Sequence, residues 1–114
     1  MTGATAQTHG GVGAAGYAAA RHILASPSIA GRTAPYIGRD GFDWYGLAEE
    51  ARSMSHGEML LVQIAHDLWE PGATVGLRDV VRRLDGRAFD RVLEGLRVAR
   101  GEVTLADEAL PAAA

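Results

Sequence analysis

The capped and strongly apolar run of residues 56–69 constrains the fold more than any other part of the chain. Ser55 and Glu58 stand at the spacing of a capping box, in which each side chain accepts a hydrogen bond from the backbone amide of the other residue. A helix with so wide an apolar face is typical of the centre of a bundle. Residues 56–69 are therefore predicted to form a buried helix that ends at Pro71-Gly72. Its apolar residues are Leu60, Leu61, Val62, Ile64, Ala65, Leu68 and Trp69.

Two shorter amphipathic runs follow and repeat the same apolar spacing. The first is carried by Leu77, Val80, Val81 and Leu84, and the second by Phe89, Val92, Leu93 and Leu96. Asp85-Gly86 separates the two runs, and Asp85 can cap the second. Because amphipathic helices joined by short links bury one another's apolar faces, the predicted fold is all-α. Its predicted core is a small three-helix bundle over residues 55–100, in which a hairpin of residues 77–100 packs on the helix of residues 56–69.

The N-terminal half is predicted to add lesser elements to this core. Residues 14–26 are expected to form a peripheral helix that Pro27 ends, and Asp43 can cap a short helix near residues 44–53. A long, irregular, aromatic-containing loop is expected between these helices. The predicted domain division is a flexible N-terminal arm over residues 1–13, a single helical domain over residues 14–110 and a disordered tail over residues 111–114.

A glycine pattern at the start of the chain matches that of dinucleotide-binding sites. Gly11, Gly13 and Gly16 stand as Gly-x-Gly-x-x-Gly before a predicted helix. That chemistry needs a strand before the glycines and a βαβ unit around them. Since residues 1–10 hold no apolar strand, we interpret the match as a chance feature of a segment rich in glycine and alanine.

Several classes of catalytic and metal site are excluded by composition and motif. The chain has no cysteine, and all eleven basic residues are arginine, so thiolate sites and lysine-containing phosphate loops are excluded. His66 and Glu70 lie one helical turn apart, but two ligands on one helix do not make a metal site. No nucleophile-elbow motif occurs. The sequence therefore predicts a protein that is not an enzyme and that holds neither a metal nor a cofactor.

The charge and hydropathy patterns indicate a cytoplasmic protein. The formal net charge of −3 is too small to indicate a strongly acidic or basic partner. No run approaches the roughly 18 consecutive apolar residues of a membrane span, and the start lacks the basic and apolar regions of a signal peptide. We expect a cytoplasmic bacterial protein, or a virion component if the source is a phage, that does not bind a membrane.

Four of the seven aromatic residues lie close together in residues 27–46. A loop of this length without structure of its own is uncommon in a compact domain. Its aromatic side chains therefore either fasten it to the core or bind a partner. The candidate partner-binding residues are Tyr36, Phe42, Trp44 and Tyr45.

The arginine-rich run of residues 76–101 suggests a second kind of site. A short helix, a tight turn and a longer basic helix resemble a helix-turn-helix, in which Arg87, Arg91 and Arg97 would meet phosphates or base edges. The turn is shorter than that motif usually has, and acidic residues are interleaved with the arginines. We therefore hold DNA binding through residues 77–100 as the alternative function. The first hypothesis is a non-catalytic protein–protein interaction or accessory subunit that self-associates or binds a protein partner.

Overall fold

The described part of the chain is built from helices. The computed structural model describes residues 13–70, 72 and 75–102. Within those residues the only β-type pairing is one isolated bridge between Ile37 and Phe42, which confirms the all-α prediction. The helices in chain order are α2 (Gly13–Leu24), α3 (Ala30–Thr33), the 3-10 helix η1 (Ala34–Tyr36), α4 (Trp44–Ala51), α5 (His56–Trp69), α6 (Leu77–Arg83) and α7 (Gly86–Ala99).

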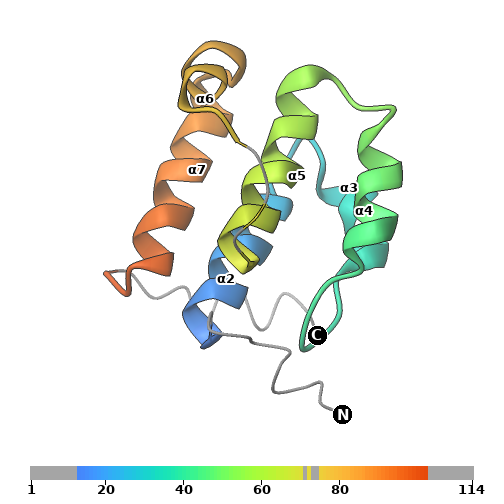
Figure 1. Cartoon of the computed structure of the whole chain (residues 1–114), viewed down its shortest axis with the longest axis vertical. Coiled ribbons are helices and arrows are strands. Elements are labelled where there is room, and N and C mark those ends of the chain that lie inside the picture. Colours follow the sequence, from blue (N-terminus) through green and yellow to red (C-terminus); the bar gives the residue numbers. More distant parts are fainter. Residues whose placement is uncertain (1–12, 71, 73–74, 103–114) are drawn as a thin grey trace.

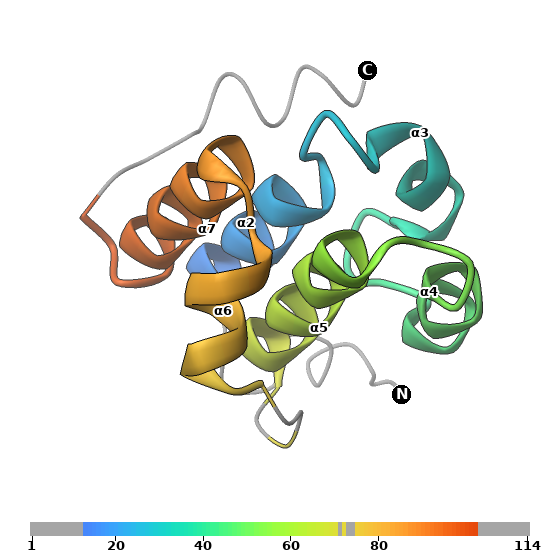
Figure 2. The same cartoon turned by 90° about the horizontal axis from the view of Figure 1, so that it is seen from above.

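Helix α2 lies at the centre of the arrangement. Figure 1 and Figure 2 show it between α5 and α7 and antiparallel to both, while α3 and α4 lie on the far side of α5. The prediction of a peripheral N-terminal helix is therefore wrong, and the core consists of α2, α5 and α7 rather than of residues 55–100 alone. The physical reason is that small side chains let two neighbours approach α2 at once. Its buried residues are Gly16, Tyr17, Ala19, Ala20, Ile23 and Leu24.

The contact between α2 and α7 depends on the absence of a side chain at Gly95. A Cβ atom built at this position would lie 2.8 Å from both Cγ1 and Cδ1 of Ile23 and 3.5 Å from the carbonyl oxygen of Ala19. Ile23 is fully buried and has little room to move. Val92 and Val98 of α7 are buried on either side of Gly95, so this face of α7 is committed to α2.

The C-terminal end of α2 is held by side chains from three later segments. Helix ends leave backbone carbonyl groups without partners inside the helix. The buried hydroxyl of Ser26 donates to the Ile23 carbonyl at 2.6 Å, and the buried hydroxyl of Thr33 donates to the Leu24 carbonyl at 2.7 Å. Arg91 of α7 donates from Nε to the His22 carbonyl at 2.9 Å. These bonds tie the end of α2 to the segment that follows it and to α7.

The caps predicted at Ser55, Asp43 and Asp85 form, and a further cap predicted at residues 104–107 lies outside the described residues. The Ser55 hydroxyl accepts from the Glu58 amide at 3.2 Å, and the Glu58 carboxylate accepts from the Ser55 amide at 3.1 Å. Asp43 and Asp85 cap α4 and α7 through the amides of residues 46 and 88. Helix α5 is buried along much of its length, as predicted, although it shares the centre with α2.

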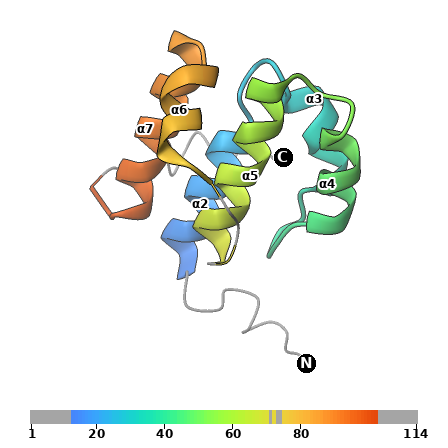
Figure 3. The same cartoon turned by 45° about the horizontal axis from the view of Figure 1, so that its top comes forward.

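Helix α6 buries only part of the apolar stripe predicted for it. None of its residues is fully buried, although Val80 is half-buried against the core and Leu84, directly after the helix, belongs to the core. Seen end-on in Figure 1 and from a tilted view in Figure 3, α6 runs across the direction of α7 near the start of that helix. Its end contacts the first turn of α5, where a Cβ atom at Gly57 would lie 2.8 Å from the Arg83 carbonyl oxygen. The predicted packing of residues 77–100 on α5 as one hairpin is therefore wrong, because α7 packs mainly on α2.

The predicted irregular loop is partly helical and is fastened to α4. It contains α3, η1 and the bridge between Ile37 and Phe42. Arg32 donates from Nε to Glu50 at 2.8 Å, and the Tyr36 hydroxyl donates to the other carboxylate oxygen at 3.1 Å. These bonds, that from Arg32 first, hold the pKa of the Glu50 carboxyl below its ordinary value. The bond to Glu50 raises the pKa of the Tyr36 phenol.

The two terminal predictions fall outside the described residues. The arm of residues 1–13 overlaps them only at Gly13, which begins α2 with a φ of 72°, and the tail of residues 111–114 lies wholly outside. Among the described residues, no helix combines the length and apolar character that crossing a membrane requires.

We predict that Gly95→Ala lowers the free energy of unfolding by about 1 kcal/mol. Overpacking against Ile23 and Ala19 costs about 1–3 kcal/mol, which exceeds the gain of about 0.5–1 kcal/mol from placing alanine in a helix. Chemical denaturation followed by circular dichroism measures the change. Gly86→Ala in the same helix is the control, since a Cβ atom there meets nothing within 4 Å. Equal stability of the two variants would contradict the proposed close contact.

Candidate functional site

The aromatic residues predicted to bind a partner form a cluster around Phe42. The ring centroid of Phe42 lies 5.0 Å from that of Tyr17, 4.9 Å from that of Trp44 and 5.3 Å from that of Trp69. The Tyr17 hydroxyl also donates to the Gly38 carbonyl. Rings from α2, α5 and the segment before α4 thus pack together and fasten that segment to the core.

Trp44 and Tyr45 are neighbours in sequence but have different surroundings. The Trp44 ring stacks on His66 of α5, with centroids 4.4 Å apart and planes 11° from parallel. Its Nε1 atom is buried and has no hydrogen-bond partner among the described residues. Tyr45 instead has 78% of its surface exposed. Of the four predicted residues, Tyr36, Phe42 and Trp44 are half-buried in packing contacts, and Tyr45 alone faces solvent.

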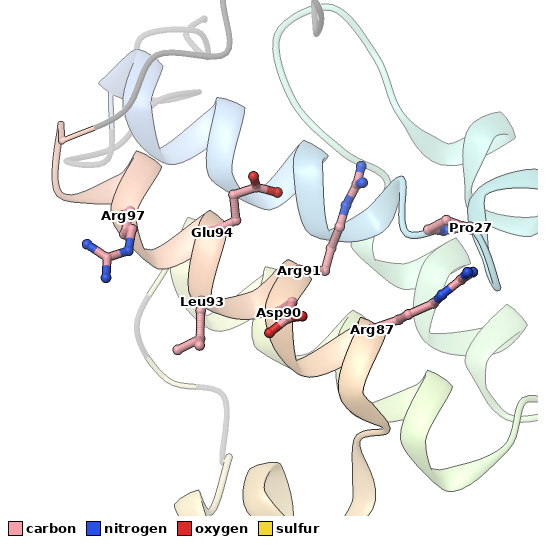
Figure 4. A pocket seen from close by; sticks show the side chains of 7 residues that line it. All are labelled: Pro27, Arg87, Asp90, Arg91, Leu93, Glu94 and Arg97. Atoms are coloured by element: carbon pink, nitrogen blue, oxygen red, sulfur yellow. The ribbon is translucent and has the colours of Figure 1, made fainter.

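The three arginines of the alternative hypothesis line one shallow concavity on α7. Its volume is about 560 Å³, and Pro27, Asp90, Leu93 and Glu94 complete the lining, as Figure 4 shows. Arg91 points toward α2 and donates to the carbonyls of His22 and Ala25, so it acts as a cap for that helix. Glu94 lies 2.7 Å from Nε2 of His22. Much of this face therefore serves the contact between α2 and α7.

The other two arginines, Arg87 and Arg97, differ in whether they have an ion-pair or hydrogen-bond partner. Arg97 pairs with Glu102 at 3.0 Å. Arg87 is exposed and has no hydrogen bond or ion pair with any described residue. With Asp90 and Glu94 interleaved among them, the three arginines do not form a continuous basic surface.

The structure exposes apolar side chains that the sequence assigned to the core. Four of the five large hydrophobic residues exposed in the described chain lie on α6 and α7. Leu77 and Val81, one turn apart on α6, are 80% and 68% exposed, and Leu93 and Leu96, one turn apart on α7, are 43% and 41% exposed. We call these four residues the α6–α7 surface. Sequence reasoning missed it because an apolar stripe has the same spacing whether or not a neighbour covers it; the shortness of α6, seven residues, was the available signal.

We predict that Trp44→Ala lowers the free energy of unfolding clearly more than Tyr45→Ala does. Loss of the half-buried Trp44 ring is expected to lower the free energy of unfolding by about 2 kcal/mol, below the cost for a fully buried ring. Tyr45→Ala is expected to change it by no more than about 0.5 kcal/mol. Urea denaturation followed by far-ultraviolet circular dichroism measures both. Similar losses in the two variants would contradict the different surroundings of these residues.

We predict that Arg91→Met lowers the free energy of unfolding by about 1–2 kcal/mol. The methionine keeps part of the apolar stem but leaves the carbonyls at the end of α2 without their charged donor. Arg87→Met on the same helix is the matched control, and it is expected to change stability by no more than about 0.5 kcal/mol. A tolerance of Arg91→Met equal to that of the control would show that the cap is not needed for stability.

The described residues contain no group of three or more His, Cys, Asp or Glu side chains that could hold a metal ion. His66 lies against the Trp44 ring, and the backbone amide of Glu70 donates to the His66 carbonyl. Comparison with known proteins finds no matching family model, no similar curated protein and no similar solved structure. Inference about function therefore depends on the surface of this chain.

Proposed function

We propose that the protein is a non-catalytic protein–protein interaction module, an accessory subunit of a larger bacterial or phage assembly. The observation that supports this most is the α6–α7 surface. Removing apolar surface from water contributes about 25 cal/mol per Å². A partner that covers Leu77 and Val81, which are 80% and 68% exposed, would gain most of their transfer free energy.

The position of Leu77 and Val81 supports a role in binding rather than in folding. None of the residues of α6 is buried, so polar residues at these two positions would leave the core intact. Leu93 and Leu96 are further exposed apolar residues on α7, the helix that Leu84 and Asp85 join directly to α6. Adjoining helices with exposed apolar residues are a common docking platform for a helical segment.

The aromatic segment supports the proposal less than its sequence suggested. Phe42 and Trp44 are used in packing, and Tyr36 is bonded to Glu50. Tyr45 remains available at a separate place on the molecule, on α4. We therefore place the main contact on α6 and α7 and keep Tyr45 as a further candidate contact.

DNA binding remains the second candidate because Arg87, Arg91 and Arg97 share one concavity. It has less support, since Arg91 is bonded to α2 and Arg97 to Glu102. The exposed carboxylate of Asp90 also lies in the concavity and would repel a phosphate backbone.

We predict that the double variant Leu77→Gln/Val81→Gln loses association while it keeps its fold. Glutamine favours helices and removes the apolar surface, and exposed substitutions change stability by no more than about 0.5 kcal/mol each. Sedimentation velocity of the purified protein at moderate salt measures self-association, and affinity capture measures a retained partner. Arg39→Gln is the control for an exposed substitution outside α6 and α7. A native chain that is strictly monomeric and captures nothing, or association that survives the double substitution, would overturn the proposal.

A further inference from the structure

Helix α6 presents an apolar pair and a basic pair side by side. Leu77 and Val81 are one turn apart on the helix, and Arg78 and Arg82 follow them by one residue each. Because successive helical residues are about 100° apart around the axis, the two pairs form neighbouring stripes along the same exposed side. All four residues are exposed.

The arginines beside this apolar pair are unpaired, unlike most in the described chain. Arg78, Arg82 and Arg87 have no hydrogen bond or ion pair with a described residue, whereas Arg83 lies 3.6 Å from Asp79 and also contacts His56. Elsewhere in the described chain, Arg39 is the one other arginine without such a partner. The arginines with partners are Arg21, Arg32, Arg52, Arg83, Arg91, Arg97 and Arg100.

From this arrangement we infer that the α6–α7 surface binds an acidic amphipathic helix of a protein partner. The partner's apolar stripe covers Leu77 and Val81, and its carboxylates pair with Arg78 and Arg82. Opposite charges around an apolar contact set the orientation and specificity of a complex and speed its formation. The inference rests on the proposed interaction function and adds the chemistry of the partner.

A protein helix fits this surface better than a uniformly anionic partner does. The carboxylates of Asp79, Asp85 and Asp90 are exposed among the same arginines. The phosphates of a duplex or the headgroups of an anionic membrane would meet these carboxylates as well as the arginines. A peptide can place acidic residues opposite the arginines and neutral residues opposite the aspartates.

The experiment uses the full chain and a labelled synthetic helix of about 18 residues, long enough to form in water when alanine-rich. The probe carries leucine at i, i+3, i+4 and i+7 and glutamate on both flanks of that stripe. A second peptide has glutamine in place of glutamate, and a third has lysine. Fluorescence anisotropy is expected to show the glutamate peptide binding most tightly, with affinity that falls as salt rises.

Charge reversal gives the decisive comparison. Arg78→Glu/Arg82→Glu is expected to weaken binding of the glutamate peptide about tenfold or more and to strengthen binding of the lysine peptide. Arg39→Glu is the matched control, since Arg39 is also exposed and unpaired among the described residues but lies before α4. Absence of glutamate-peptide binding, or an equal effect of Arg39→Glu, would overturn the inference.

Two further arms separate this inference from its alternatives. Leu77→Gln/Val81→Gln is expected to abolish peptide binding. If this variant loses association but the native chain binds the glutamate, glutamine and lysine peptides equally well, the interaction function is supported and the acidic partner is wrong. Duplex DNA and vesicles of phosphatidylcholine with phosphatidylserine are offered in the same assay. Binding of either that depends on Arg78 and Arg82, without binding of the glutamate peptide, overturns the inference. If the protein instead forms a dimer through Leu77 and Val81 that excludes the peptide, the inference is wrong and the surface binds a second copy of this chain.

Discussion

The close contact of α2 with two neighbours at once is the constraint on which the rest of the structure depends. Helices approach this closely only where one or both carry small residues at the crossing. Gly95 of α7 supplies that space against Ile23 and Ala19 of α2, while the opposite side of α2 packs on α5. Since α5 and α7 make few direct contacts, α2 holds the two together. The orientation of α7, and with it the position of α6, follows from this packing.

The same packing decides what the basic residues of α7 can do. The C-terminal end of α2 presents carbonyl groups and a partial negative charge, which Arg91 satisfies directly. His22 near the same end is bonded to Glu94. Part of the basic side of α7, which the sequence suggested could bind phosphates, therefore makes hydrogen bonds within the protein. Four arginines have no partner among the described residues, and they do not form a continuous basic face. Arg78 and Arg82 lie beside exposed apolar residues on α6, Arg87 lies in the first turn of α7, and Arg39 lies before α4.

Local signals predicted the helices well, because caps and breaks act over a few residues. Ser55, Asp43 and Asp85 cap helices at their predicted starts. The packing order was not predictable in the same way. Alanine and glycine on α2 contribute little to an apolar pattern, yet they allow the two-sided contact that makes this helix central. The aromatic cluster has a similar cause: the sequence shows Phe42 beside Trp44, but only the fold brings Tyr17 and Trp69 against it.

Exposed leucine and valine on α6 carry more information than the same residues on a core helix. Val80 and Leu84 pack this segment against the core, so selection for stability does not require Leu77 or Val81 to be apolar. Two stripes of different chemistry on one short exposed helix are a demanding pattern for a surface that meets only water. Because Leu77 and Val81 can be altered without disturbing α2, α5 or α7, changes at these two positions report on association and not on folding. The two helices therefore have different roles: α2 packs against α5 and α7 and holds the fold together, whereas α6, next to the start of α7, exposes the apolar surface.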